Sequence, residues 1–134
     1  SLQVAGYSHP AKQTPVMQTY EYKGFIPGVE GPGMLYDLSI LRSEYSSDGK
    51  YILLTTLQQI NNRKQLPNTS RGSLEMQRGH AEDPNATIYK LTDEVDDTIL
   101  YLQVMGNNRL RLLTNQLPDS LKQAGFNLDL ELVQ

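Results

Sequence analysis

The chain has no cysteine and no tryptophan among its 134 residues. Without cysteine there are no disulfide bonds, no thiolate metal ligands and no cysteine nucleophile. No apolar run reaches the roughly 18 residues of a membrane-spanning helix, and the chain does not open on a charged region followed by an apolar one. If the protein is exported, we therefore expect this sequence to be a mature or trimmed form.

An excess of basic charge is also lacking. The chain carries 12 basic and 15 acidic residues, for a formal net charge of −3. Because nucleic-acid binding requires cationic side chains that neutralise phosphates, nucleic acid is not an expected partner. The length suits one domain with a single core.

Leucine dominates the apolar residues, and the aromatic residues are eight tyrosines and two phenylalanines. Such side chains suit half-buried strands. Alternation of apolar and polar residues predicts eight strands, at residues 18–26, 35–43, 50–57, 71–78, 86–91, 98–105, 109–114 and 127–133. Short strands joined by hairpin-type connections favour an antiparallel meander that hides its edges by closing into a barrel. The predicted fold is therefore all-β, a small lipocalin-like barrel.

Three local signals complete this prediction. Ser46-Ser47-Asp48-Gly49 predicts a tight hairpin turn, with Asp-Gly supplying the positive φ, and Gly106-Asn107-Asn108 predicts another. Residues 119–125 form the one helix candidate, a single short turn near the C-terminus. Residues 1–17 lack periodicity and predict a flexible N-terminal tether, which leaves 18–134 as the barrel domain.

The loop between the first two predicted strands has an unusual composition. Its residues are Pro27, Gly28, Val29, Glu30, Gly31, Pro32 and Gly33. Glycine supplies backbone angles closed to other residues and proline fixes φ, so this loop is expected to hold one defined shape. We interpret it as a candidate recognition surface.

Several stretches resemble a known family. Residues 22–34, YKGFIPGVEGPGM, resemble Y-x-G-x-L-P-C-x-x-C-P-G-I of the N-terminal domain family of NlpE, a copper-resistance and envelope-stress outer-membrane lipoprotein. Residues 48–51 (DGKY) resemble its D-G-T-Y hairpin, 72–74 (GSL) its G-x-W strand start, and 106–113 (GNNRLRLL) its G-x-N-x-L-x-x-L segment. The resemblance covers residue 20 to about residue 133 and implies a small β-barrel likened to lipocalins.

The resemblance also implies a setting in the bacterial envelope. The family member would be exported to the periplasm or cell surface, held at the outer membrane by a lipidated cysteine upstream of Ser1, and would act on envelope proteins in homeostasis or stress sensing. Where the family has C-x-x-C, this chain has Gly28-Val29-Glu30-Gly31. Because glycine offers no thiolate, copper and redox chemistry do not transfer, and no cofactor is expected.

Metal and catalytic sites find little support in the residues. His80 near Glu82 and Asp83 has a spacing common in solvated turns, and the four methionines are typical gap-fillers of a core. The acidic run from Asp93 to Asp97 lacks the spacing of a calcium loop. No nucleophile elbow or phosphate-binding loop is present, so an enzyme is not expected.

Two functions from different classes remain. The first is a non-enzymatic NlpE-like envelope lipoprotein domain that acts through protein contacts. The second is a lipocalin-like carrier of a small hydrophobic ligand, with a barrel mouth lined by Tyr20, Tyr22, Tyr36 and Tyr89. An interior filled by side chains would disfavour the carrier. Leu41, Leu54 and Leu57, on otherwise polar faces, are candidates for a partner-facing patch or for further core packing.

Overall fold

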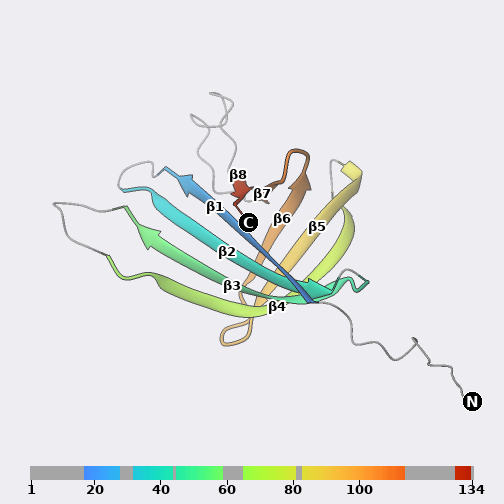
Figure 1. Ribbon diagram of the computed structural model, residues 1–134, viewed down its shortest axis with the longest axis horizontal. Coiled ribbons are helices and arrows are strands. Elements are labelled where there is room, and N and C mark those ends of the chain that lie inside the picture. The colour runs from blue at the N-terminus through green and yellow to red at the C-terminus, as the bar shows by residue number, and fades with distance from the viewer. Residues whose placement is uncertain are drawn as a thin grey trace, which may run out of the picture.

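A computed structural model describes residues 17–27, 32–43, 45–58, 65–80, 83–113 and 129–133. These residues contain eight strands and no helix. The strands are β1 (Met17–Ile26), β2 (Met34–Ser43), β3 (Asp48–Leu57), β4 (Asn68–His80), β5 (Asp83–Asp93), β6 (Ile99–Met105), β7 (Arg109–Leu113) and β8 (Asp129–Leu132). Each pairs antiparallel with the next and β8 pairs with β1, which closes a barrel in chain order (Figure 1). The predicted all-β meander barrel is confirmed.

The predicted helix at 119–125 lies outside the described residues. So does the predicted tether, apart from Met17, which begins β1. Most strand ends match the prediction within two residues, but β4 and β5 are longer than expected. Gly79, at φ 89°, forms a bulge after which pairing resumes between His80 and Asp83, so β4 extends past residue 78 and β5 begins before residue 86, the limits of the two predicted strands.

The two predicted turns have different outcomes. Asn107 and Asn108 have φ of 63° and 59°, so the left-handed turn between β6 and β7 is confirmed. The hairpin predicted at Ser46-Ser47-Asp48-Gly49 is confirmed between β2 and β3, but its connection is 44–47, and Asp48 and Gly49 are already paired within β3. A Cβ at Gly49 would lie 2.6 Å from the Leu41 carbonyl oxygen. Close approach to β2, rather than a positive φ, therefore explains this glycine.

Alternate side chains point into the barrel and fill much of it. The largest fully buried side chains are leucines and one isoleucine: Leu38, Ile40, Leu74, Leu91, Leu102, Leu110 and Leu130. Tyr51, Leu53, Tyr89 and Leu112 complete the buried cluster. The centre of the barrel is thus packed like a protein core rather than open as a channel.

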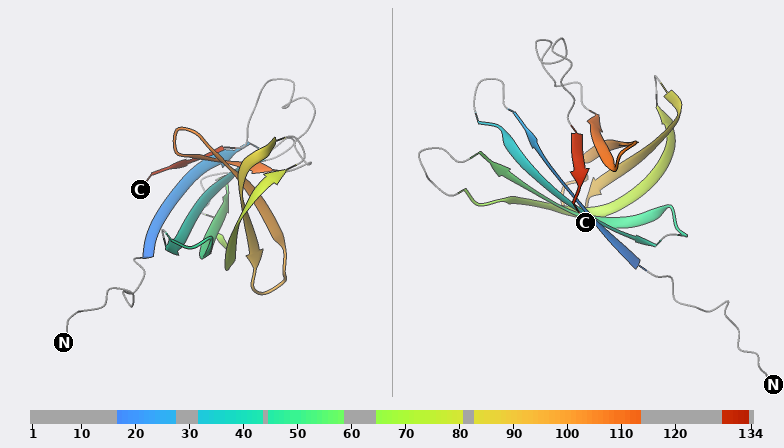
Figure 2. Two further views of the ribbon diagram at one scale, coloured as in Figure 1. Left: turned by 90° about the vertical axis from the view of Figure 1, so that its right-hand side faces the viewer. Right: turned by 45° about the horizontal axis from the view of Figure 1, so that its top comes forward.

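The barrel is closed by its shortest strand. β8 lies between β7 and β1, seen in red between orange and blue in the right-hand view of Figure 2. Leu130 on β8 is 1% exposed, and its Cδ2 would lie 2.6 Å from a Cβ added at Gly24 of β1. Glycine at position 24 therefore leaves the space that Leu130 occupies.

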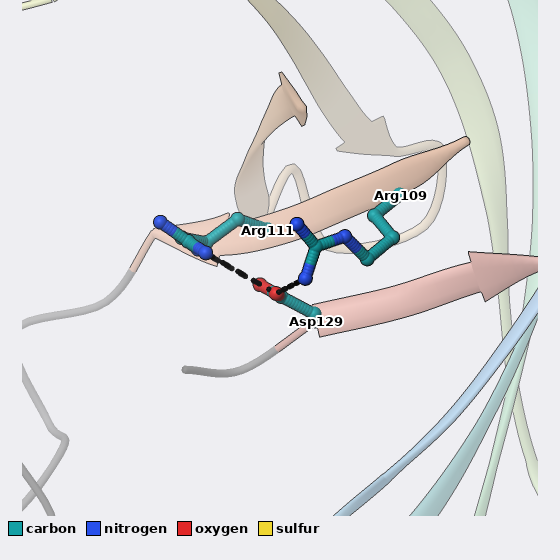
Figure 3. A network of polar contacts seen from close by, with 3 residues as sticks. All are labelled: Arg109, Arg111 and Asp129. Carbon is teal, nitrogen blue, oxygen red and sulfur yellow. Dashed lines mark hydrogen bonds and ion pairs between the residues drawn. The ribbon is translucent and has the colours of Figure 1, made fainter. Parts of the chain in front are cut away.

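An ion-pair network on the outer wall fixes β8 to β7 (Figure 3). Arg111 Nε donates to Asp129 Oδ1 at 2.8 Å and its terminal nitrogen to Oδ2 at 3.2 Å, while Arg109 donates to Oδ2 at 3.1 Å. The Asp129 side chain is only 13% exposed. A forked, largely desolvated pair of this kind is stronger than an ordinary surface ion pair.

The two ends of the barrel differ in how the strands are connected. At one end the connections are short: 44–47, 81–82 and 106–108. At the other end most are longer: 27–33, 58–67, 94–98 and 114–128. We call these the short-turn end and the long-connection end.

Candidate functional site

A cavity of about 290 Å³ opens among inward-facing residues toward the long-connection end. We call it the mouth cavity. Its lining comes from β2 to β6 and the turn between β5 and β6, and consists of Met34, Tyr36, Tyr51, Leu53, Thr55, Asn68, Ser70, Asp93, Asp96, Thr98, Ile99 and Leu100. The packed core thus stops short of this end and leaves room for a small molecule.

The lining is divided between apolar and polar strands. β2 and β6 contribute apolar surface, including Met34 and Leu100. β4 and β5 contribute polar groups, including Asn68, Ser70 and Asp93. A ligand in the cavity would therefore meet apolar side chains on some sides and hydrogen-bonding groups on others.

A chain of hydrogen bonds runs across the polar wall. Ser70 Oγ donates to Asp93 Oδ2 at 2.8 Å. Because the Ser70 hydroxyl has only one proton, the Tyr51 hydroxyl, 2.8 Å from Ser70 Oγ, is the donor in that contact. Three strands, β3, β4 and β5, are joined in this way.

Asp93 also holds the turn that follows β5. Its Oδ1 accepts the backbone N–H groups of Val95 at 2.7 Å and Asp96 at 3.2 Å. The Ser70 hydroxyl and these backbone donors lower the pKa of Asp93 from its ordinary value. The carboxylate is therefore ionised at neutral pH.

The four tyrosines predicted to line one barrel mouth do not lie together in the structure. All four lie on inward-facing positions of their strands, but only Tyr36 lines the mouth cavity. Tyr20, Tyr22 and Tyr89 lie elsewhere, near Arg42. Alternation identifies the inner face, whereas the position along the barrel axis depends on strand register, which the sequence pattern does not give.

Arg42 and the nearby Tyr20, Tyr22 and Tyr89 form a second inward-facing polar cluster, which we call the Arg42 group. The Arg42 guanidinium lies 5.9 Å from the centroid of the Tyr20 ring, within cation–π range. Arg42 pairs with Gly49, close to the short-turn end, and the Tyr20 hydroxyl donates to Gln18 Oε1. Burial raises the pKa of the Tyr89 hydroxyl, although the positive charge of Arg42 acts to lower it.

The predicted recognition loop is described only at its edges. Gly28, Val29, Glu30 and Gly31 lie outside the described residues, and Pro27, Pro32 and Gly33 flank them. The Gly33 carbonyl accepts the Gln58 N–H at 2.8 Å, and a Cβ at Gly33 would lie 2.3 Å from the Phe25 ring. The same Cβ would lie 2.8 Å from the Ile26 carbonyl oxygen, and this close backbone approach favours glycine at position 33. Pro27, Pro32 and Gly33 do not line the mouth cavity.

The sequence reasoning missed Ser70 and Asp93 as lining residues. The polar residues 58–70, between two predicted strands, suggest a long excursion or a strand extension that ends in a loop, and Asp93 was expected in an acidic connection. In the structure β4 begins at Asn68 and β5 extends to Asp93. Extending the alternation of Leu74 backward through Gly72 to Ser70 is the signal that would have placed Ser70 inside the barrel. Within the described ranges, no three His, Asp or Glu side chains come together as metal ligands.

Scans against protein-family models, curated proteins and solved structures each gave no match to this chain. In the part of the chain that the structure describes, there is no helix of the length and hydropathy needed to cross a membrane. Because the comparisons gave no match, a function has to be inferred from the mouth cavity and its hydrogen-bond chain.

We expect the raised pKa of the Tyr22 hydroxyl to make the stability of the folded protein fall at alkaline pH. Burial raises the pKa of the Tyr22 hydroxyl to about 12, and the neighbouring Tyr89 and Tyr20 add to that increase. The folded state then holds a proton that the unfolded state releases, so stability should fall as pH rises from about 10 to about 12. Urea unfolding across this range should show a shallower fall for Tyr22→Phe than for the wild type.

Because Tyr22 is partly exposed, solvent screening makes the difference a modest one. Below about pH 9, where the phenol is protonated in both states, the two proteins should show the same pH slope. Equal slopes through the alkaline range would contradict the buried position of this hydroxyl.

Proposed function

We propose that this domain is a non-enzymatic binding protein that takes a small, mainly apolar molecule into the mouth cavity. The observation that carries the proposal is the cavity itself. Its volume of about 290 Å³ lies just below the usual range of ligand pockets, about 300–1,000 Å³. It exceeds the roughly 150 Å³ that accommodates benzene in an engineered protein cavity. A short alkyl chain or one ring with a polar substituent would fit.

The chemistry of the lining supports binding rather than catalysis. None of the described residues that line the cavity is histidine, lysine or cysteine. The hydroxyl of Ser70 is hydrogen-bonded to Asp93, whose lowered pKa makes it a weak general base. The polar wall is thus suited to hold and orient a ligand.

A probe of matching size tests this proposal. Hexan-1-ol should bind the wild-type protein with a dissociation constant of about a millimolar or less, measured by NMR titration. Thr55→Trp, which places an indole in the cavity, should weaken binding by about tenfold or more. Thr56→Trp is the matched control, because Thr56 faces outward on the same strand.

Both variants should keep the circular dichroism of a β-barrel. Loss of binding in Thr55→Trp alone would support the cavity as the binding site. Absence of hexan-1-ol binding to the wild type, or equal binding to both variants, would contradict the proposed function.

A second candidate function is contact with proteins of the bacterial envelope, as the resemblance implies. The observation that favours it is the outer wall of β1 to β3, where Phe25, Leu35, Leu41 and Ile52 are 36–51% exposed. Phe25 pairs directly with Leu35, so the apolar surface spans neighbouring strands. Leu54 also faces outward, whereas Leu57 pairs with Met34 on the inner side of the long-connection end.

Site-specific photo-crosslinking in bacterial cells tests this second candidate. A photoreactive residue at Ile52 should give a discrete adduct in the envelope fraction. The same residue at Tyr101, which is on the outer wall of β6 and similarly exposed, 40% against 42%, should not. Identical adducts at both positions, or none at Ile52, would contradict an interface on this wall.

A further inference from the structure

We propose that the mouth cavity prefers ligands whose polar group is a protonated amine, with Asp93 as the main acceptor. This inference rests on the proposed function and names the chemistry of its ligand. The described residues that line the cavity include two carboxylates, Asp93 and Asp96, and no arginine, lysine or histidine. Among these described residues a bound anion would face like charge with no cation to offset it, whereas a cation would meet opposite charge.

The hydrogen bonds of Asp93 leave room for a further donor. A carboxylate offers about four acceptor positions. Three are used in the structure, by Ser70 on Oδ2 and by the backbone N–H groups of Val95 and Asp96 on Oδ1. No hydrogen bond among the described residues uses the second acceptor position of Oδ2, so a ligand donor in the cavity could take it.

The same bonds prepare Asp93 to receive a positive charge. They lower its pKa, so the carboxylate stays ionised well below neutral pH, and they fix its orientation before any ligand arrives. Loss of side-chain freedom on binding is correspondingly small. The Asp93 carboxylate is a preorganised acceptor at the edge of the cavity, with Asp96 as the other carboxylate among the described lining residues.

Other acceptors lie on the same polar wall. Asn68, Ser70 and Thr98 contribute oxygen atoms to the lining. An ammonium group has three donors and no acceptor, so it can use several of these oxygens at once. A neutral hydroxyl has one donor and gains less. Met34, Leu53 and Leu100 would contact the apolar remainder of such a ligand.

Three probes that share one alkyl chain isolate the contribution of the polar group: hexylamine, hexan-1-ol and hexanoate. At neutral pH and low salt, hexylamine should bind the wild type about tenfold more tightly than hexan-1-ol, because its charge is only partly screened at this site. Hexanoate should bind most weakly. Raising the sodium chloride concentration should weaken hexylamine binding and leave hexan-1-ol unchanged.

Asp93→Asn should reduce hexylamine binding to the level of hexan-1-ol. The asparagine keeps an oxygen that can accept the turn N–H groups, so the fold should be retained. Asp37→Asn is the control, because Asp37 lies on the outer wall and does not line the cavity. If Asp93→Asn unfolds, the salt dependence of wild-type binding gives the same test.

The outcomes separate the two proposals. Equal binding of hexylamine and hexan-1-ol to the wild type would overturn the preference for amines and leave the binding function standing. Failure of all three probes to bind would overturn both. Tight hexylamine binding that persists in Asp93→Asn would show that Asp93 is not the acceptor.

Discussion

Closure of an eight-stranded sheet by a strand of only four residues is the constraint on which this structure depends. β8 must pair with β7 and β1 at once, or the inward faces of all strands would meet water. Leu130 contributes most to this closure, because a fully buried leucine stabilises by about 1.5–3 kcal/mol. Gly24 leaves it space, and Asp129 aligns β8 with β7 through two arginines.

The closed wall limits where the proposed ligand could enter. Leucines fill the centre, and the Arg42 group occupies inward positions near the short-turn end. Room for a small molecule is found toward the long-connection end, where β4 and β5 bring Ser70 and Asp93 together. The same hydrogen bonds that join these strands and hold the following turn also orient the acceptor. Stability and the proposed binding would therefore rely on one set of contacts.

Most of the fold could be predicted from the sequence, whereas most of the site could not. Period-two alternation identified the eight strands and their inner faces, since it reflects a purely local geometry. The site depends on register and on strand extensions, which arise from long-range pairing. Ser70 lies in a polar stretch without clear alternation. The bulge at Gly79 lets β4 and β5 pair beyond the ends of the two predicted strands, 71–78 and 86–91. Tyr36 was foreseen as a lining residue, but its position relative to the other tyrosines was not.

Solution NMR of the closing strand tests the central claim most directly. The structure pairs Tyr22 with Leu132 and bonds the Val133 N–H to the Glu21 carbonyl at 2.8 Å. We expect nuclear Overhauser contacts between Tyr22 and Leu132, and slow hydrogen exchange at the Val133 amide relative to unpaired amides. Absence of those contacts, together with rapid exchange and a solvent-exposed Leu130 side chain, would show that the sheet is open and contradict the closed barrel.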